Sequence, residues 1–192
     1  MALLSVSKRK QYFKDLSLGE YNKDNILKLQ KKYLKRKSDH DGIYGNNTDN
    51  LLRTIYACSK TKNFKAQEFA CECGGKYCCG YPSYMKEFQL KHLQTIRDYY
   101  GKPMTITCGL RCRAENNRVG GIKNSLHLSG TATDFYMKGV TDTLSNRRKA
   151  ILVIRKLKRH HYTYGNLCNS VDLNSRSPRA LGMGNALHTD TK

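Results

Sequence analysis

A histidine and an aspartate stand seven residues apart in the segment SLHLSGTATD, which runs from Ser125 to Asp134. Gly130 and Ala132 lie between them; the glycine would let a loop fold back, and the alanine leaves room beside the carboxylate. Imidazole and carboxylate are good Zn²⁺ ligands, and a catalytic zinc takes three protein ligands and leaves its fourth position to water. His127 and Asp134 therefore predict a metal site that still needs a third ligand.

We expect the third ligand from the C-terminal segment GNALHTDTK. His188 and Asp190 stand two residues apart there, so in a strand they would share one face. A set of His127, Asp134 and His188 would give the nitrogen and oxygen coordination that suits a hydrolytic metal. The other interpretation of the first pair is a hydrogen-bonded histidine and aspartate without a metal.

The segments that carry these residues are expected to form a mainly antiparallel sheet with flanking helices. Alternating patterns predict strands at residues 103–108, 131–137, 161–164 and 186–191. Helices are expected over residues 83–100, ending at Gly101, and over residues 144–157. His92 falls on the apolar face of the first of these helices, so we expect it to be a packed core histidine. The pattern indicates an α+β fold.

The first sixty residues have a helical pattern instead. Apolar residues recur at helical spacing on both sides of SDHDGIYGNNTDN, where Asp41 and Gly42 signal a turn and Asn47 or Thr48 can cap the next helix. A weaker helical segment covers residues 8–19. We therefore expect a small three-helix domain over residues 1–62 and the α+β domain over residues 63–192.

The net charge of +20 is the strongest feature of the composition. Such a surface attracts nucleic acid, anionic lipid or anionic wall polymers, and both parts of the chain are basic, which excludes a single basic tail. A basic and aromatic nucleic-acid motif is missing, so specific nucleic-acid binding is not expected. The sequence lacks a signal-peptide pattern, and its longest aliphatic run, residues 150–154, is too short for a transmembrane segment. We expect synthesis in the cytoplasm.

Half of the eight cysteines lie in CECGGKYCCG, at Cys71, Cys73, Cys78 and Cys79. This spacing differs from the paired CxxC of common zinc modules. In a reducing compartment the cluster suggests metal or free thiols, and in an oxidising one it suggests disulfides. A structural role is expected, either as disulfides or as a small zinc knuckle.

The pattern S-x-H-x-x-G-x-A-x-D, with ITCGLR before it and an apolar-H-x-D strand far after it, resembles the zinc D-Ala-D-Ala carboxypeptidases and L,D-endopeptidases of peptidase family M15. The resemblance runs from about residue 64 to residue 192. It implies hydrolysis of peptide bonds in peptidoglycan stem peptides, as many phage endolysins perform. It also implies that His127, Asp134 and His188 hold Zn²⁺ and that Arg111 meets the substrate carbonyl or carboxylate.

The sequence departs from this family at the general base. Related enzymes place a glutamate three residues before the last zinc histidine or a histidine two before it, and here those positions are Asn185 and Ala186. Asp190 would serve either as the base or as an acceptor that orients His188. Further candidates for proton transfer or oxyanion stabilisation are His160, His161, Tyr162 and Tyr164.

The N-terminal segment has a resemblance of its own. Leu29-Gln30, Leu34 and DGIYGNNT resemble the peptidoglycan-binding repeat found beside many wall hydrolases. Together the two resemblances imply a zinc-dependent peptidase that binds peptidoglycan and anionic wall polymers and acts at the wall after release. The alternative function is a non-catalytic wall-binding protein that retains the zinc site.

Overall fold

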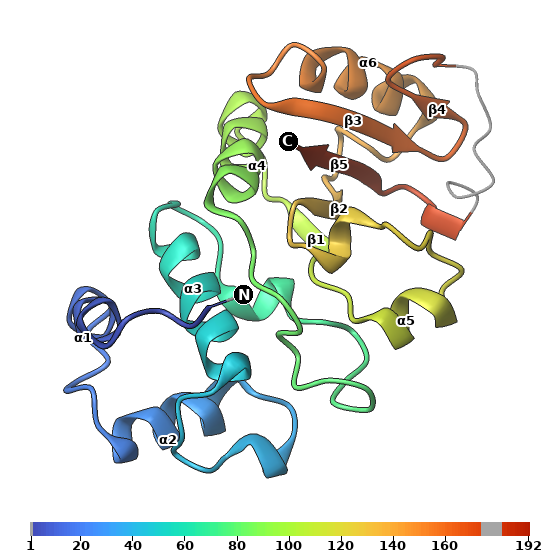
Figure 1. Cartoon of the computed structure of the whole chain (residues 1–192). Coiled ribbons are helices and arrows are strands. Elements are labelled where there is room, and N and C mark those ends of the chain that lie inside the picture. Colours follow the sequence, from blue (N-terminus) through green and yellow to red (C-terminus); the bar gives the residue numbers. More distant parts are fainter. Residues whose placement is uncertain (1, 174–181) are drawn as a thin grey trace.

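Three helices form the N-terminal part of the computed structural model, which describes residues 2–173 and 182–192 (Figure 1). They are α1 (Val6–Asp15), α2 (Lys23–Tyr33) and α3 (Asn46–Ser59). The side chain of Ser5 accepts a hydrogen bond from the backbone N–H of Lys8, and Asn22 caps α2 in the same way. These bonds satisfy donors that the start of a helix leaves free. The three expected helices are thus present.

The connection between α2 and α3 is built around the buried side chain of Gln30. Its amide nitrogen donates to Asp41 Oδ1, to the carbonyl of Ile43 and to Thr48 Oγ1, at 2.9, 2.9 and 3.0 Å. Its oxygen accepts from the backbone of Asp41 and Gly42. Gly42 has a φ of +71°, which favours glycine. The glutamine, the Asp-Gly turn and the threonine therefore form one network.

The other described elements are helical segments and strands. The helical ones are η1 (Lys37–Asp39), η2 (Ala66–Phe69), α4 (Glu87–Tyr100), α5 (Arg113–Arg118), η3 (Leu126–Leu128) and α6 (Leu144–Ile154). The strands are β1 (Thr105–Cys108), β2 (Ala132–Tyr136), β3 (His160–Gly165), β4 (Cys168–Asn169) and β5 (Leu187–Thr191). Helix α5 and strand β4 were not expected from the sequence.

Helix α4 begins later than the sequence predicted, at Glu87 rather than at residue 83. Lys86 has an extended backbone, and its N–H donates to the carbonyl of Gly130 at 2.9 Å instead of entering a helix. The helix ends as expected at Gly101, which has a φ of +58°. Because α4 starts late, the hydrogen bond of Lys86 can connect the segment before α4 to the loop that precedes β2.

The five strands form one antiparallel sheet in the order β1-β2-β5-β3-β4 (Figure 1). The C-terminal strand β5 is inserted between β2 and β3, so the last residues of the chain lie at the centre of the sheet. Helix α4 contacts β5, and α6 contacts β3 and β4. The α+β fold is therefore confirmed.

A polar network joins α4 to one face of this sheet. Gln89 Nε2 donates to the carbonyl of Thr189 at 3.1 Å, and Thr191 Oγ1 donates to Gln89 Oε1 at 2.6 Å. His92 Nε2 lies 3.0 Å from Thr189 Oγ1, and its burial lowers the pKa of His92 to about 4. His92 is the core histidine that the sequence predicted, so the opposite face of β5 is left for the residues of the site.

The hydrophobic core runs without a break from the N-terminal helices to the sheet. Buried side chains such as Phe13, Leu52, Leu93 and Phe135 belong to a single cluster. Helix α3 packs against both η2 and α4, on the far side of the expected boundary near residue 62. The division into two domains therefore stays a prediction. In the two described ranges, 2–173 and 182–192, every helix is too short or too polar to cross a bilayer.

Candidate functional site

The pairing of β2 with β5 brings the two halves of the expected metal site together. Asp134 lies opposite His188, and Ala132 lies opposite Asp190. Because side chains alternate between the faces of a strand, these four residues share one face of the sheet. Ala132 is completely buried and has only a methyl group, which keeps space beside the carboxylate.

His127 reaches the same point from η3. Its Nε2 lies 3.3 Å from His188 Nδ1 and 3.4 Å from Asp134 Oδ1, and His188 Nδ1 lies 2.7 Å from the same carboxylate oxygen. Ligands about 2.0–2.1 Å from a tetrahedral zinc ion are about 3.3–3.4 Å apart. Two separations match that spacing, and the third is that of a hydrogen bond. The three side chains thus fit one small divalent cation.

The outer nitrogens of both histidine rings have partners. His127 Nδ1 lies 2.7 Å from the carbonyl oxygen of Gly109, and His188 Nε2 lies 3.1 Å from Asp190 Oδ2. A metal-binding histidine commonly donates its second ring N–H to a carbonyl or carboxylate in this way. The ring of Tyr164 stacks on His188 with 4.5 Å between centroids. Each ring is therefore held with its inner nitrogen directed at Asp134.

Gly130 shapes the loop that carries His127. It has a φ of +74°, and a Cβ at this position would collide with the backbone carbonyl of Tyr84. The loop is fixed further because Arg111 donates its backbone N–H to the carbonyl of His127 at 3.1 Å. Gly130 therefore allows the turn that the sequence predicted, and it also allows the backbone of Tyr84 to lie close to this loop.

Two β-bulges flank the central strand pair. On β1, Ile106 and Cys108 pair with the adjacent residues Phe135 and Asp134, which makes Thr107 an extra residue. On β3, His160 and Tyr162 pair with Thr191 and Asp190, which makes His161 the extra residue. A bulge changes the direction of a side chain without ending the strand. The second one allows His161 and Tyr162 to line the same cleft.

Arg111 lies beside the proposed ligands. Its Nη2 is 3.7 Å from Asp134 Oδ2 and 3.0 Å from Cys108 Sγ, and its Nη1 donates to Asn116 Oδ1 at 3.4 Å. The guanidinium is therefore held on one side of Asp134 by contacts from two different segments.

Electrostatics couple His127 to Asp134. Burial alone would lower the pKa of His127, but the charge of Asp134, followed by Cys108, outweighs it and raises that pKa. Burial would raise the pKa of Asp134, and His127 with His188 outweighs it and lowers that pKa. The carboxylate thus stays charged and His127 holds a proton that a bound cation would displace, so metal binding is expected to weaken at low pH.

These residues open into a cleft of about 970 Å³. It is lined by the segment after α5, by β3 and by β5, and also by the earlier residues Glu72 and Arg111. Other lining residues are His161, Tyr162, Tyr164 and Lys192. The cleft is large enough for a short peptide, since ligand sites commonly occupy 300–1,000 Å³. All the side chains expected to take part in chemistry except His160 line it or touch it.

The sequence profile of the peptidase M15 family matches residues 62–165. The chain belongs to the peptidase M15 family. The matched segment contains Arg111, His127, Asp134 and His161, whereas His188 and Asp190 lie beyond it on β5. No curated protein sequence matches the chain. Membership of the M15 family supports a peptidase, and M15 peptidases generally depend on zinc.

Asn185 and Ala186 stand at the two positions where related M15 enzymes carry the general base, and both have structural surroundings here. Asn185 Oδ1 accepts a hydrogen bond from Arg147 Nη1 at 3.2 Å, and Ala186 is buried. His160 Nε2 is bonded to Thr163 Oγ1 at 2.9 Å, and its ring neighbours His92 rather than the cleft. His161 instead lies with its Nδ1 2.6 Å from Asp190 Oδ1.

Sequence reasoning missed two residues of this M15 site. Cys108 Sγ lies 3.7 Å from His127 Nδ1, and Cys108, His127 and Asp134 can also converge on a metal. The signal was present in ITCGLR, the segment in which Cys108 stands three residues before Arg111. Glu72 lines the cleft near Arg111, and loss of solvation there raises its pKa. No local pattern around Glu72 pointed to the site.

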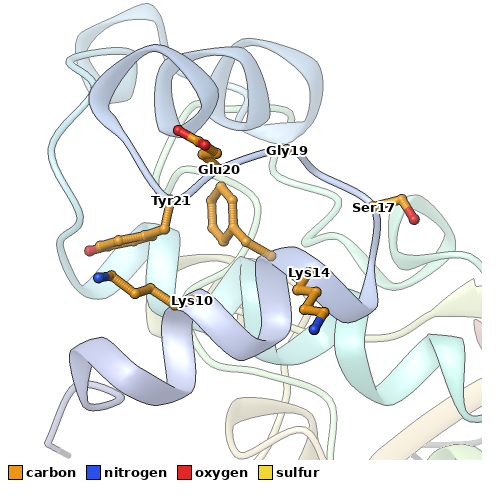
Figure 2. Close-up of a pocket in the computed structure, with 7 residues that line it drawn as sticks. Lys10, Lys14, Ser17, Gly19, Glu20 and Tyr21 are labelled. Carbon is orange, nitrogen blue, oxygen red and sulfur yellow. The ribbon is translucent and has the colours of Figure 1, made fainter.

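A second hollow, of about 620 Å³, lies in the helical N-terminal part (Figure 2). Figure 2 shows Lys10 and Lys14 projecting from α1, with Lys10 beside Tyr21, and Phe13 also lines the hollow. The hollow shares no residue with the cleft, and its lining contains neither histidine nor cysteine. It is therefore separate from the candidate metal site.

Proposed function

We propose that this M15 peptidase is a zinc-dependent enzyme that hydrolyses peptide bonds in the stem peptides of bacterial peptidoglycan, in the manner of an endolysin. The observation that carries the proposal is the convergence of His127, Asp134 and His188 inside a cleft, each ring held by a second partner. Both parts of the sequence resemble proteins that act on or bind the bacterial wall, which supports peptidoglycan as the substrate.

In this proposal His127, Asp134 and His188 hold the zinc ion. Zinc bound there would polarise the scissile carbonyl and lower the pKa of a water molecule to about 7. Arg111 binds the substrate carbonyl or carboxylate, a task for which a planar guanidinium is suited because it offers two parallel donors. Asp190 orients His188 through the bond to Nε2.

We further propose that His161 is the group that moves a proton. Asp190 accepts hydrogen bonds on both oxygens, from His188 and His161, and these bonds outweigh burial and lower its pKa. An ionised carboxylate with two partners is a poor base and a good positioning group. It holds His161 by Nδ1, which leaves Nε2 of this partly exposed ring for the cleft.

Two substitutions separate these roles. We expect His161→Gln to lower the rate of peptide hydrolysis about 10²–10³-fold with unchanged zinc content, since acid–base groups contribute on that scale. Asp190→Asn is expected to weaken zinc affinity about 10–100-fold, because it loosens His188. His160→Gln is the matched control and keeps both properties. If Glu72→Gln loses peptide hydrolysis while His161→Gln keeps full activity, Glu72 rather than His161 is the group that moves the proton.

The N-terminal helices are proposed to hold the enzyme on the wall. The protein has a net charge of +20, and exposed Lys10 and Lys14 flank the hollow of α1. Anionic wall polymers are suited to such a surface, and binding should weaken with rising salt. The unusual residues at Asn185 and Ala186 favour one competing function, a wall-binding protein without catalysis.

Purified peptidoglycan separates the two functions. Incubation with the full chain and Zn²⁺ should release new amino termini, and a chelator should stop the release. Sedimentation with the wall should be strong at low salt and weak at high salt. Wall binding without new termini in the presence of Zn²⁺ would leave only the non-catalytic function, and equal retention at both salt concentrations would contradict the charge argument.

A further inference from the structure

Four cysteine sulfurs meet at a point outside the lining of the cleft. They belong to Cys71, Cys73, Cys78 and Cys112, and all four Sγ atoms lie within 4.8 Å of one another. The Sγ atoms of Cys73 and Cys78 are 3.4 Å apart. The sequence grouped Cys79 with the first three, which was wrong. Cys79 Sγ instead accepts from the backbone N–H of Tyr81, and Cys112 supplies the fourth sulfur.

We propose that these four thiolates bind a structural Zn²⁺ ion, distinct from the ion of the cleft. Sulfur ligands about 2.3 Å from a tetrahedral zinc are about 3.8 Å apart. The 3.4 Å between Cys73 and Cys78, and the upper limit of 4.8 Å for every pair, agree with that spacing. Two disulfides would place the sulfurs in bonded pairs about 2.05 Å apart. A single central cation explains why all four sulfurs approach one another.

The backbone around the cluster is arranged as thiolate ligands require. Backbone N–H groups donate to the sulfurs: Cys112 to Cys71 Sγ at 3.4 Å and Glu115 to Cys112 Sγ at 3.5 Å. Gly74 and Gly75 both have positive φ, which lets the chain turn between Cys73 and Cys78. Such N–H bonds orient a ligand and stabilise its negative charge. Zinc binding would release the thiol protons to solvent.

The ion would connect two segments that line the catalytic cleft and so stabilise that wall. Arg111 directly precedes Cys112, and Glu72 lies between Cys71 and Cys73; both line the cleft. The two segments already touch, because Leu110 donates its N–H to the carbonyl of Phe69 at 2.9 Å. Four ligands from both segments would close the coordination sphere, as in a structural site, and would position Arg111.

Metal content in the full-length protein tests the proposal. We expect two Zn²⁺ per chain in the wild type and one in Cys73→Ser. His127→Ala should also hold one, and the double variant none. Cys79→Ala is the matched control from the same loop and should keep two. If Cys73→Ser keeps the zinc content of the wild type, or if the four cysteines of the unreduced wild type resist alkylation after unfolding with chelator, the proposal is overturned.

Cobalt provides a measurement that does not depend on a variant. Co²⁺ added to the metal-free chain should give strong sulfur-to-cobalt charge-transfer absorption, which ligands of nitrogen and oxygen alone do not produce. The absorption should persist in His127→Ala. A spectrum free of this absorption would contradict the tetrathiolate site, and it would leave the cleft and its peptidase chemistry untouched.

Discussion

His127→Ala is expected to remove the zinc of the cleft and to lower peptidoglycan hydrolysis by about 10³-fold or more. His127 supplies one of the three proposed ligand atoms. Without it, only Asp134 and His188 remain, and these two already form a 2.7 Å hydrogen bond that needs no metal. Polarisation of the carbonyl by a metal contributes several kcal/mol, and about 4 kcal/mol corresponds to about a 10³-fold change in rate.

The measurement is the rate of amino-terminus release from peptidoglycan, together with zinc content. His160→Gln is again the control, because His160 is a partly buried histidine of the same sheet that bonds Thr163 and does not line the cleft. It should retain the zinc of the cleft and a rate within about threefold of the wild type. Full activity in His127→Ala would contradict both the ligand set and the hydrolytic mechanism.

Arg111→Lys is expected to reduce kcat about 10²–10³-fold while the zinc content stays that of the wild type. Removal of one donor to a developing oxyanion costs on this scale. The guanidinium is held by Cys108 Sγ at 3.0 Å and by Asn116 Oδ1 at 3.4 Å, so its fork has a fixed direction. Lysine keeps the charge but offers a flexible ammonium without two parallel donors.

Arg113→Lys is the matched control for this change. Arg113 lies two residues further along, is exposed and does not line the cleft. It should leave kcat and zinc content unchanged. An Arg111→Lys enzyme with normal kcat and a raised KM would show that Arg111 binds the substrate without stabilising the transition state. Loss of zinc in that variant would mean that the arginine acts by holding Asp134.

Local sequence determined the types of the helices and strands and the residue types of the proposed metal ligands. Alternating residues predicted four of the five strands, because one face of each had to be buried. Helical spacing predicted the N-terminal helices for the same reason. The choice of His127, Asp134 and His188 needed only residue types and spacing, since few side chains bind zinc and the strand period decides which of them share a face.

Tertiary structure decided what these residues touch. His127 and His188 are 61 positions apart, and no local preference places β5 between β2 and β3; that order arises only when the whole sheet pairs. The β-bulge that turns His161 towards Asp190 is an irregularity in the pairing of β3 with β5, so it exists only when both strands are present.

The cysteines show the same limit most directly. Three of the four clustered sulfurs come from one short segment and could be seen in the sequence. The fourth, Cys112, joins them because the segment before α5 folds against η2, where Leu110 bonds to Phe69. Spacing along the chain therefore identified which groups can bind a metal, whereas contacts between distant segments selected the groups that actually meet, since a metal site depends on distances in space.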